Sequence, residues 1–395
     1  MAQRLWNISE FSALLRQRAT AGQQPTIDLG QGSPTGPTPR VVQEALRVAA
    51  NAPGYPKSVG SQPLREAYAA WAQRRLSVEI QPDAVLATIG SKELIADLPR
   101  LLRLSNTSLV GIPALAYPTY EVGALRVGAQ VIRSDSLLAF GPSRPNLLWL
   151  NTPSNPTGKT LPVQHLRKVV QWARDSGCVV ASDECYLELA EPDSPAPSIL
   201  SPEVNDGDLT GLLAVHSLSK RSAMAGYREG MVSGDPGLIA DLASQRRNAG
   251  LIVPEPIQAA ATAAWNDDDH VRLAAQQYQQ RRVDLAAALT EAAFVVQSPS
   301  EGLFLWVRAD PANPHMNPDR TDAGAPGSDL PPDMQLVEHF LALGILVAPG
   351  SFYGPSGHEH VRISLTGSPA EQATAVQRIV AAGPVNRAAG VSDSS

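Results

Sequence analysis

Lysine is scarce in this chain of 395 residues. Of its 32 cationic side chains, 27 are arginines and only five are lysines: Lys57, Lys92, Lys159, Lys168 and Lys220. The 38 acidic side chains outnumber the cationic ones, and the formal charge of -6 provides no electrostatic basis for binding a nucleic-acid backbone. Any chemistry that needs a lysine amine therefore has five candidates.

Long apolar runs are absent as well. No stretch approaches the roughly 20 residues of a membrane span, and the first residues lack the apolar core of a signal peptide, so we expect a cytoplasmic protein. The two cysteines, Cys178 and Cys185, lie in or just after an apolar run, which favours reduced core thiols over a disulfide or a metal site. With 43% apolar and 18% charged residues, the composition is that of a globular chain of two or three domains.

Short apolar runs alternate with amphipathic helical stretches through the first two thirds of the chain. The buried strands that we expect are Ala84 to Ile89, Leu147 to Leu150, Cys178 to Ser182 and Leu212 to Val215. This alternation predicts an α/β fold with a mainly parallel sheet. The last third, with a long helical stretch from Asp269 to about Ala293 followed by strand-like segments, predicts a smaller α+β domain.

Ligands of an open parallel sheet bind beyond the carboxyl ends of its strands, so the residues that follow each apolar run are informative. Gly90, Ser91 and Lys92 follow the first run and precede a helix, where backbone N–H groups suit a phosphate or serve only as a helix cap. A proline-rich loop after the second run presents Asn155. Asp183 follows the third run. An acid at this position is a metal ligand, a nucleophile, a hydrogen-bond partner for a protonated ring nitrogen or a helix cap, and local sequence does not choose among these roles.

The fourth run leads into His216-Ser217-Leu218-Ser219-Lys220, with Arg228 a few residues further on. Desolvation at the end of a buried strand lowers the pKa of a lysine amine and so favours Schiff-base formation. The alternative is a lysine that leaves the sheet and lies in solvent. The hydroxyls and the arginine suit a phosphate. Together, the four strand ends favour a phosphorylated ring with an aldehyde and a basic nitrogen, which describes pyridoxal 5'-phosphate.

These residues resemble the motifs of the class I/II aminotransferases, which are pyridoxal-phosphate enzymes of fold type I, and the resemblance covers nearly the whole chain. It implies a large domain over residues 40–280 with a mainly parallel seven-stranded sheet, and a small α+β domain from residues 1–39 and 281–395. By this resemblance Lys220 binds the cofactor aldehyde and Asp183 pairs with the pyridinium nitrogen. Asn155 and Tyr186 hydrogen-bond the phenolic oxygen of the ring, and Tyr186 joins Lys220 and Asp183 as a catalytic residue.

The remaining cofactor contacts follow from the same resemblance. Tyr117 matches the aromatic side chain that stacks on the ring, in the segment Ala116-Tyr117-Pro118-Thr119-Tyr120. The phosphate contacts would come from Ser91, Lys92, Ser217, Ser219 and Arg228. Tyr55 matches a residue that reaches the phosphate of the neighbouring subunit, which implies a homodimer.

Substrate contacts are implied at three positions. Arg362 resembles the arginine that grips the substrate α-carboxylate, although an exposed strand arginine is the simpler interpretation. Gly32 resembles a backbone contact to the same carboxylate, and Asn155 also faces the substrate. No metal site is predicted, because His358 and His360 lack a third ligand at a recognisable spacing.

Within the family, several segments look most like bacterial N-succinyldiaminopimelate aminotransferases of lysine biosynthesis, among them Asp183-Glu184-Cys185-Tyr186 and the segment from Ser217 to Arg228. Such an enzyme transfers an amino group between glutamate and N-succinyl-2-amino-6-oxopimelate. Ala223 departs from the asparagine expected after Arg221-Ser222. Another aminotransferase specificity, for aspartate or a different amino acid, or a C–S β-lyase remains the alternative, because the fold alone does not select the bond that breaks.

Overall fold

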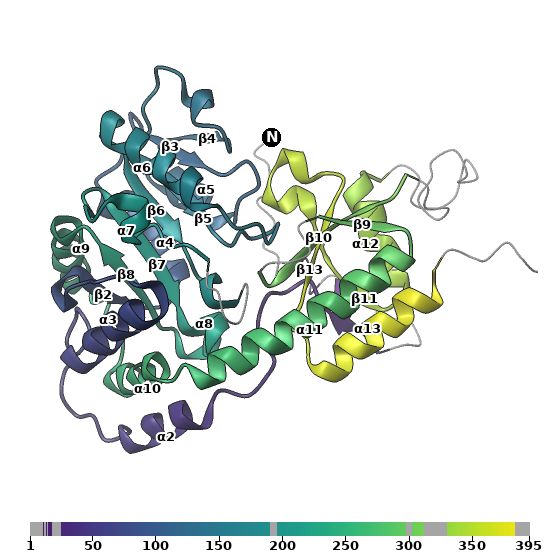
Figure 1. Ribbon diagram of the computed structural model, residues 1–395, viewed down its shortest axis with the longest axis horizontal. Helices are drawn as coiled ribbons and strands as arrows, with labels where there is room; N and C mark the ends of the chain where they lie inside the picture. Colours follow the sequence, from purple (N-terminus) through teal and green to yellow (C-terminus); the bar gives the residue numbers. More distant parts are fainter. Residues whose placement is uncertain are drawn as a thin grey trace, which may run out of the picture. The chain divides into compact units, whose positions relative to one another are not determined.

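The computed structural model describes residues 11, 13, 15–17, 25–189, 196–297, 302–311 and 330–383 (Figure 1). The chain forms two compact units. The larger unit comprises residues 33–279 and 301–303, and the smaller unit comprises residues 1–32, 280–300 and 304–395. Within the described ranges, no helix combines the length and the apolar character that a bilayer crossing requires.

A seven-stranded sheet forms the centre of the larger unit, in the order β2-β8-β7-β6-β5-β3-β4. Its strands are β2 (Val85–Thr88), β3 (Leu109–Ile112), β4 (Gln130–Arg133), β5 (Leu147–Asn151), β6 (Val179–Asp183), β7 (Leu212–Ser217) and β8 (Gly230–Gly234). Strands β4, β3, β5, β6 and β7 pair in parallel, and β8 runs antiparallel to both of its neighbours, β7 and β2. The predicted mainly parallel sheet is confirmed.

Both faces of this sheet are buried, and successive side chains alternate between them. Leu212 and Ala214 of β7 pack in one apolar cluster with Trp71 and Trp265, whereas Leu213 and Val215 belong to a second cluster with other helices. The helices of the first cluster include α3 (Gln62–Leu76), α6 (Val163–Ser176), α7 (Pro202–Asn205) and α10 (Glu255–Asn266). Those of the second are α4 (Ser91–Leu101), α5 (Thr119–Arg126) and α9 (Pro236–Asn248). The sheet is therefore covered by helices on both faces.

Helix α6 shows how local sequence sets an element. Its buried residues, Leu166, Val169, Val170 and Ala173, recur at helical spacing and form an apolar stripe. The helix ends at Gly177, whose φ of 68° is the left-handed conformation that favours glycine at a helix C-terminus. Two other helices of this unit are α2 (Arg40–Val48) and the short α8 (Leu218–Arg221).

The smaller unit is built on an antiparallel sheet in the order β12-β13-β10-β9, whose strands are β9 (Phe294–Gln297), β10 (Phe304–Ala309), β12 (Ala348–Pro349) and β13 (Val361–Ser364). A second, parallel pair joins β1 (Ile27–Asp28) to β11 (Ile345–Leu346). Its helices are α12 (Pro332–Ala342), α13 (Pro369–Ala381) and the later turns of α11 (Asp269–Glu291). A capping box at Ser368 and Glu371 fixes the start of α13.

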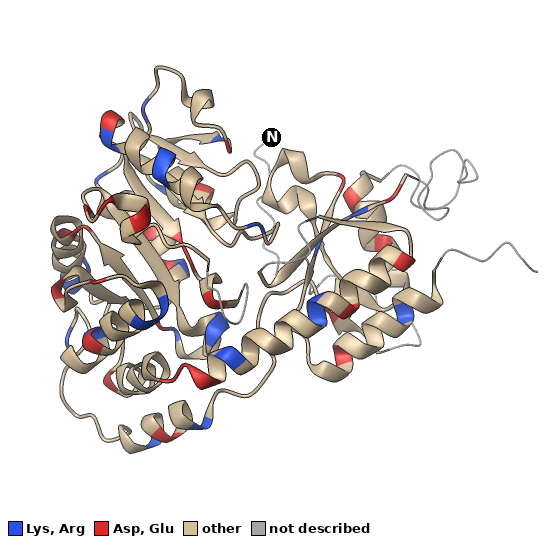
Figure 2. Ribbon diagram, viewed as in Figure 1, with Lys and Arg blue, Asp and Glu red and all other residues tan. Residues whose placement is uncertain are grey.

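Charges of both signs are interspersed along the elements of each unit (Figure 2). Both cysteines are free thiols buried in the larger unit, as the sequence predicts.

Candidate active site

The carboxyl ends of β5, β6 and β7 bring three predicted site segments to one edge of the sheet. The parallel register aligns Asn151 of β5 with Asp183 of β6. The Asn151 amide donates to the backbone oxygen of Asp183 at 2.9 Å, and its side-chain oxygen accepts from the backbone N–H of Asn155 at 2.6 Å. Asn155 is thereby fixed beside the end of β6, with 5% of its surface exposed.

Asp183 is a buried carboxylate with defined donors. Its Oδ2 accepts from the Tyr120 hydroxyl at 2.7 Å, and its Oδ1 accepts from the backbone N–H of Cys185 at 3.3 Å. Burial raises the pKa of Asp183, and the hydrogen bonds from Cys185 and Tyr120 and the charge of His216 oppose that rise. Among the described residues, no group of three or more His, Cys, Asp or Glu is placed to hold a metal ion, which disfavours the metal-ligand alternative for Asp183.

Tyr120 is a site residue that the sequence reasoning missed. It lies in α5, three residues after Tyr117, and its ring stacks on Trp149 with a centroid distance of 4.9 Å and an interplanar angle of 16°. The Tyr117 ring meets the Tyr120 ring edge-on at 5.8 Å. No local signal identifies it, because its partner Asp183 lies 63 residues away in the chain.

The Cys185 thiol is buried just after the end of β6 and interacts with groups of three predicted site segments. Burial and the charge of Asp183 raise its pKa well above the usual value, whereas a hydrogen bond from Ser91 and the charge of Lys220 lower it. Groups at the start of α4 and on α8 thus both act on a thiol that lies just after the end of β6. Tyr186, 8% exposed, follows directly in the chain.

The start of α4 has the features of an anion site. Gly90 is the N-cap residue of the helix, with a φ of 71°, and it has no side chain with which to cap the first turn. A Cβ atom built on Gly90 would lie 2.4 Å from Nη2 of Arg228, so the absence of a side chain lets the guanidinium lie against this helix end. A Cβ on Gly230 would lie 3.0 Å from the Ser91 nitrogen, and Gly230 pairs with Ser217 across β7 and β8.

Ser217 also organises the segment that carries the lysine. Its Oγ accepts from the backbone N–H of Ser219 at 3.1 Å and caps α8, in which Lys220 is partly buried. Lys92 is exposed on α4, so only its backbone fits the phosphate role. Tyr55 is fully exposed in this single chain. A phosphate at the start of α4 would therefore meet backbone N–H groups, Arg228 and the serine hydroxyls.

Arg362 lies in the smaller unit and is only 3% exposed, which excludes the alternative of an exposed strand arginine. Its Nη2 donates to the Gly30 oxygen at 2.5 Å, and its guanidinium carbon lies 4.1 Å from the Phe304 ring centre and 5.2 Å from that of Tyr353. A Cβ on Gly32 would lie 2.6 Å from Cε1 of Phe304. The smaller unit thus holds the arginine and both glycines in one cluster.

The larger unit presents a buried carboxylate, a lysine and an uncapped helix end backed by an arginine. This set fits a phosphorylated pyridine aldehyde. A family model described as "Aminotransferase class I and II" matches residues 24–379, and the chain belongs to this family. The enzymes of this family use pyridoxal 5'-phosphate.

Several known proteins resemble this chain over most of its length. A "Probable aminotransferase Rv1178" of Mycobacterium tuberculosis is 48% identical over 93% of this chain and 84% of its own. The "4-dedimethylamino-4-oxo-anhydrotetracycline transaminase OxyQ" of Streptomyces rimosus is 44% identical over 92% and 96%. An "LL-diaminopimelate aminotransferase" of Aquifex aeolicus is 30% identical over 86% and 87%. The protein is an aminotransferase.

The fold is that of solved aminotransferases. The N-succinyldiaminopimelate aminotransferase of Mycobacterium tuberculosis superposes with a TM-score of 0.81, at 24% identity, over 95% of this chain and 97% of that one. At this identity the likeness establishes the fold type I architecture alone.

Proposed function

We propose that the enzyme transfers the amino group of glutamate to N-succinyl-2-amino-6-oxopimelate, and that it acts in the diaminopimelate route of lysine biosynthesis. The observation that carries the site assignment is the buried Asp183 carboxylate at the carboxyl end of β6, which aligns with Asn151 of β5 and accepts from the Tyr120 hydroxyl at 2.7 Å. The substrate proposal rests on the sequence motifs, and the similarity to the LL-diaminopimelate aminotransferase of Aquifex aeolicus agrees with a dicarboxylic amino-acid substrate.

The proposed roles of this chain's residues follow from their chemistry. Pyridoxal phosphate supplies a ring that accepts electrons released at the substrate α-carbon. Asp183 keeps the ring nitrogen protonated by pairing with its charge. The Lys220 amine would hold the aldehyde carbon until substrate releases it. The free amine would then take the proton from the substrate α-carbon and deliver it to the carbon that carried the aldehyde. Asn155 and Tyr186 hydrogen-bond the phenolic oxygen.

The phosphate is assigned to the backbone of Ser91 and Lys92, the hydroxyls of Ser217 and Ser219, and Arg228. Tyr117 is assigned to the face of the ring. Arg362 and the backbone of Gly32 are assigned to the substrate α-carboxylate, because a guanidinium binds a carboxylate through two parallel hydrogen bonds.

We propose in addition that the large domain, residues 40–280, carries the cofactor, and that residues 1–39 and 281–395 form the small domain. The proposed assembly is a cytoplasmic homodimer in which Tyr55 contacts the phosphate bound by the partner subunit. The full exposure of Tyr55 in the single chain is consistent with this assignment.

Replacement of Lys220 tests the site. Lys220→Ala is expected to lose both the absorbance band of the lysine-bound cofactor and transamination, because no other amine occupies that position. Lys168→Ala, an exposed lysine on α6, is the matched control and should keep both. A Lys220→Ala protein with an unchanged spectrum and rate would refute the assignment.

An acceptor panel with glutamate as donor tests the substrate. The similarity to OxyQ favours a second candidate, amination of a cyclic ketone, so the panel should contain one beside the succinylated keto acid and ordinary aromatic and branched keto acids. The proposal expects the highest kcat/KM for the succinylated compound. A strong preference for any other acceptor would overturn the pathway assignment and leave the aminotransferase intact.

A further inference from the structure

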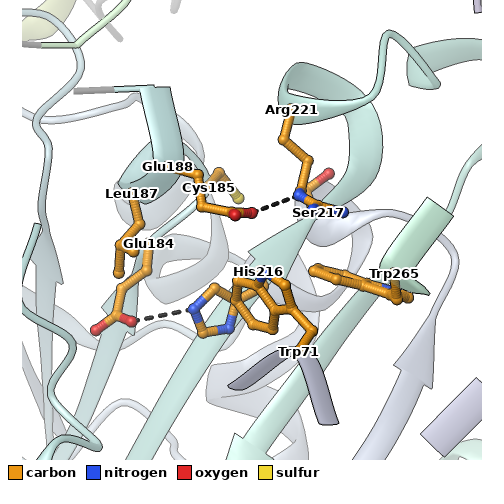
Figure 3. A pocket seen from close by; sticks show the side chains of 9 residues that line it. All are labelled: Trp71, Glu184, Cys185, Leu187, Glu188, His216, Ser217, Arg221 and Trp265. Carbon is orange, nitrogen blue, oxygen red and sulfur yellow. Dashed lines mark hydrogen bonds and ion pairs between the residues drawn. The ribbon is translucent and has the colours of Figure 1, made fainter. Parts of the chain in front are cut away.

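Four buried polar side chains form a chain of one ion pair and two hydrogen bonds behind the end of β6. Nε2 of His216 lies 3.1 Å from Oε2 of Glu184, and Nδ1 of His216 lies 2.9 Å from the Tyr68 hydroxyl (Figure 3 shows the first contact). The Tyr68 hydroxyl lies 2.7 Å from Oγ of Ser233. All four residues are at most 2% exposed. Such a chain fixes the orientation of the imidazole ring.

Strand register explains why Glu184 and His216 meet. Asp183 of β6 pairs with Val215 of β7, and the ladder continues because the Glu184 N–H donates to the Val215 oxygen at 2.9 Å. Successive side chains of a strand point to opposite faces, so Glu184 and His216 share the face opposite that of Asp183 and Val215. Helix α3 covers this face and supplies Tyr68. The carboxylate proposed for the ring nitrogen is thus one residue from a second buried carboxylate.

Glu184 has the partners of an ionised carboxylate. Its Oε2 accepts from the Ser198 hydroxyl at 2.7 Å and its Oε1 from the backbone N–H of Ile199 at 2.8 Å. An uncompensated second negative charge here would favour protonation of Asp183, because like charges in the interior repel. Asp183 must stay ionised to pair with a pyridinium nitrogen.

The other charged groups around His216 are compensated or neutral. Arg221 pairs with Glu188 in the same pocket and stacks on Trp265, 4.7 Å from its ring centre (Figure 3). Burial raises the pKa of Glu229, behind β8, to about 8, so it adds little negative charge at neutral pH. Within the described part of the chain, His216 is the basic group in contact with Glu184.

We propose that His216 and Glu184 share an additional proton as a pair without net charge, and that this pair keeps Asp183 in the carboxylate form that holds the ring nitrogen. His216 and Glu184 are positioning residues in this proposal, since they act through Asp183. The inference rests on the proposed function of Asp183. The charge of His216 lowers the pKa of Asp183 against the larger effect of burial, which agrees with it.

A double-mutant cycle separates charge compensation from a structural role. His216→Gln removes the cation and leaves Glu184 negative. The dissociation constant of pyridoxal phosphate from the apoprotein should then rise about tenfold, because the added charge shifts the ionisation equilibrium of Asp183 by about that factor. In the loaded enzyme, kcat should fall by a similar factor, with the KM for glutamate nearly unchanged. Adding Glu184→Gln removes the excess charge and should restore cofactor affinity to within about threefold of wild type.

Recovery of cofactor affinity in the double variant is the decisive result. If the pair had only a structural role, replacing both partners would lower cofactor affinity at least as much as replacing one. A double variant that binds the cofactor no better than His216→Gln overturns the proposal. Should His216→Gln fail to fold, Glu184→Gln alone decides: the proposal expects cofactor affinity within about threefold of wild type, and a tenfold loss refutes it. His360→Gln, at a buried histidine of the smaller unit, is the matched control and should leave cofactor affinity unchanged.

The outcome can be distinguished from a failure of the proposed function. If Lys220→Ala retains the lysine-bound absorbance band, the function itself is wrong. If Lys220→Ala loses the band and the double variant shows no rescue, only the role of the His216 and Glu184 pair is wrong.

Discussion

The fully buried Glu229 makes stability depend on pH in a calculable way. It lies between Arg228 and the start of β8 with none of its surface exposed. Burial raises its pKa from 4.5 to about 8, against smaller opposing effects of the Trp265 indole and the Arg221 charge. Between these two pH values the native protein keeps the carboxyl proton and the unfolded chain releases it.

The raised pKa fixes the sign and the size of the effect. Each pH unit in this range removes about 1.4 kcal/mol from the free energy of unfolding, since only the native state binds the proton. The contribution of Glu229 is fully present below pH 4.5 and is lost by about pH 8. The total loss is about 4 to 5 kcal/mol. Glu229→Gln keeps the shape of the side chain and cannot ionise, so it should escape this loss.

Denaturant unfolding of both proteins from pH 5 to pH 9, at fixed protein and cofactor concentration, measures the difference. The stability of Glu229→Gln relative to wild type should rise by about 1.4 kcal/mol per pH unit up to pH 8 and then level off. Glu79→Gln, at an exposed glutamate, should show no such slope. A difference between Glu229→Gln and wild type that is flat with pH would refute the reasoning.

Three further substitutions probe the site and the backbone around it. Gly90→Ala places a Cβ atom 2.4 Å from the Arg228 guanidinium and should weaken pyridoxal-phosphate binding by at least about tenfold, whereas Gly141→Ala, also at positive φ but in open space, should not. Tyr120→Phe removes the 2.7 Å hydrogen bond to Asp183, a loss of about 1.5 to 3 kcal/mol that a cofactor titration should record as at least a tenfold weaker affinity. Ala223→Gly relieves a φ of 49° and should raise the unfolding free energy by up to about 1 kcal/mol, and a lower denaturation midpoint would contradict this.

The central parallel strands β5 and β6 were the most predictable part of the molecule. The apolar runs at 147–150 and 178–182 match β5 and β6 to within one residue, because strands buried on both faces are apolar throughout. β8 escaped prediction, since its sequence Gly230-Met231-Val232-Ser233-Gly234 contains two glycines and one β-branched residue. Its extended conformation comes from pairing with strands on both sides, which local sequence does not encode.

Burial at the site could not be predicted from local sequence. Arg362 looks like an exposed strand arginine in the sequence, and its burial follows from the packing of Phe304, on the neighbouring strand β10, and Tyr353 against its guanidinium. Glu184 and His216 are separated by 31 intervening residues and meet only through the parallel register of β6 and β7. Tyr120 was missed for the same reason, because its partner Asp183 lies 63 residues away in the chain.

The antiparallel pairing of β7 with β8 constrains how the lysine segment can vary in length. Ser217 and Gly230 pair across the two strands, so residues 218–229 form a connection whose ends are fixed against each other. Lys220 and Arg228 both lie on it. An inserted residue before Lys220 would turn α8 by about 100° and point the amine elsewhere, because a helix makes one turn in 3.6 residues. Evolution and engineering can therefore lengthen the surface loops of this protein more easily than this connection.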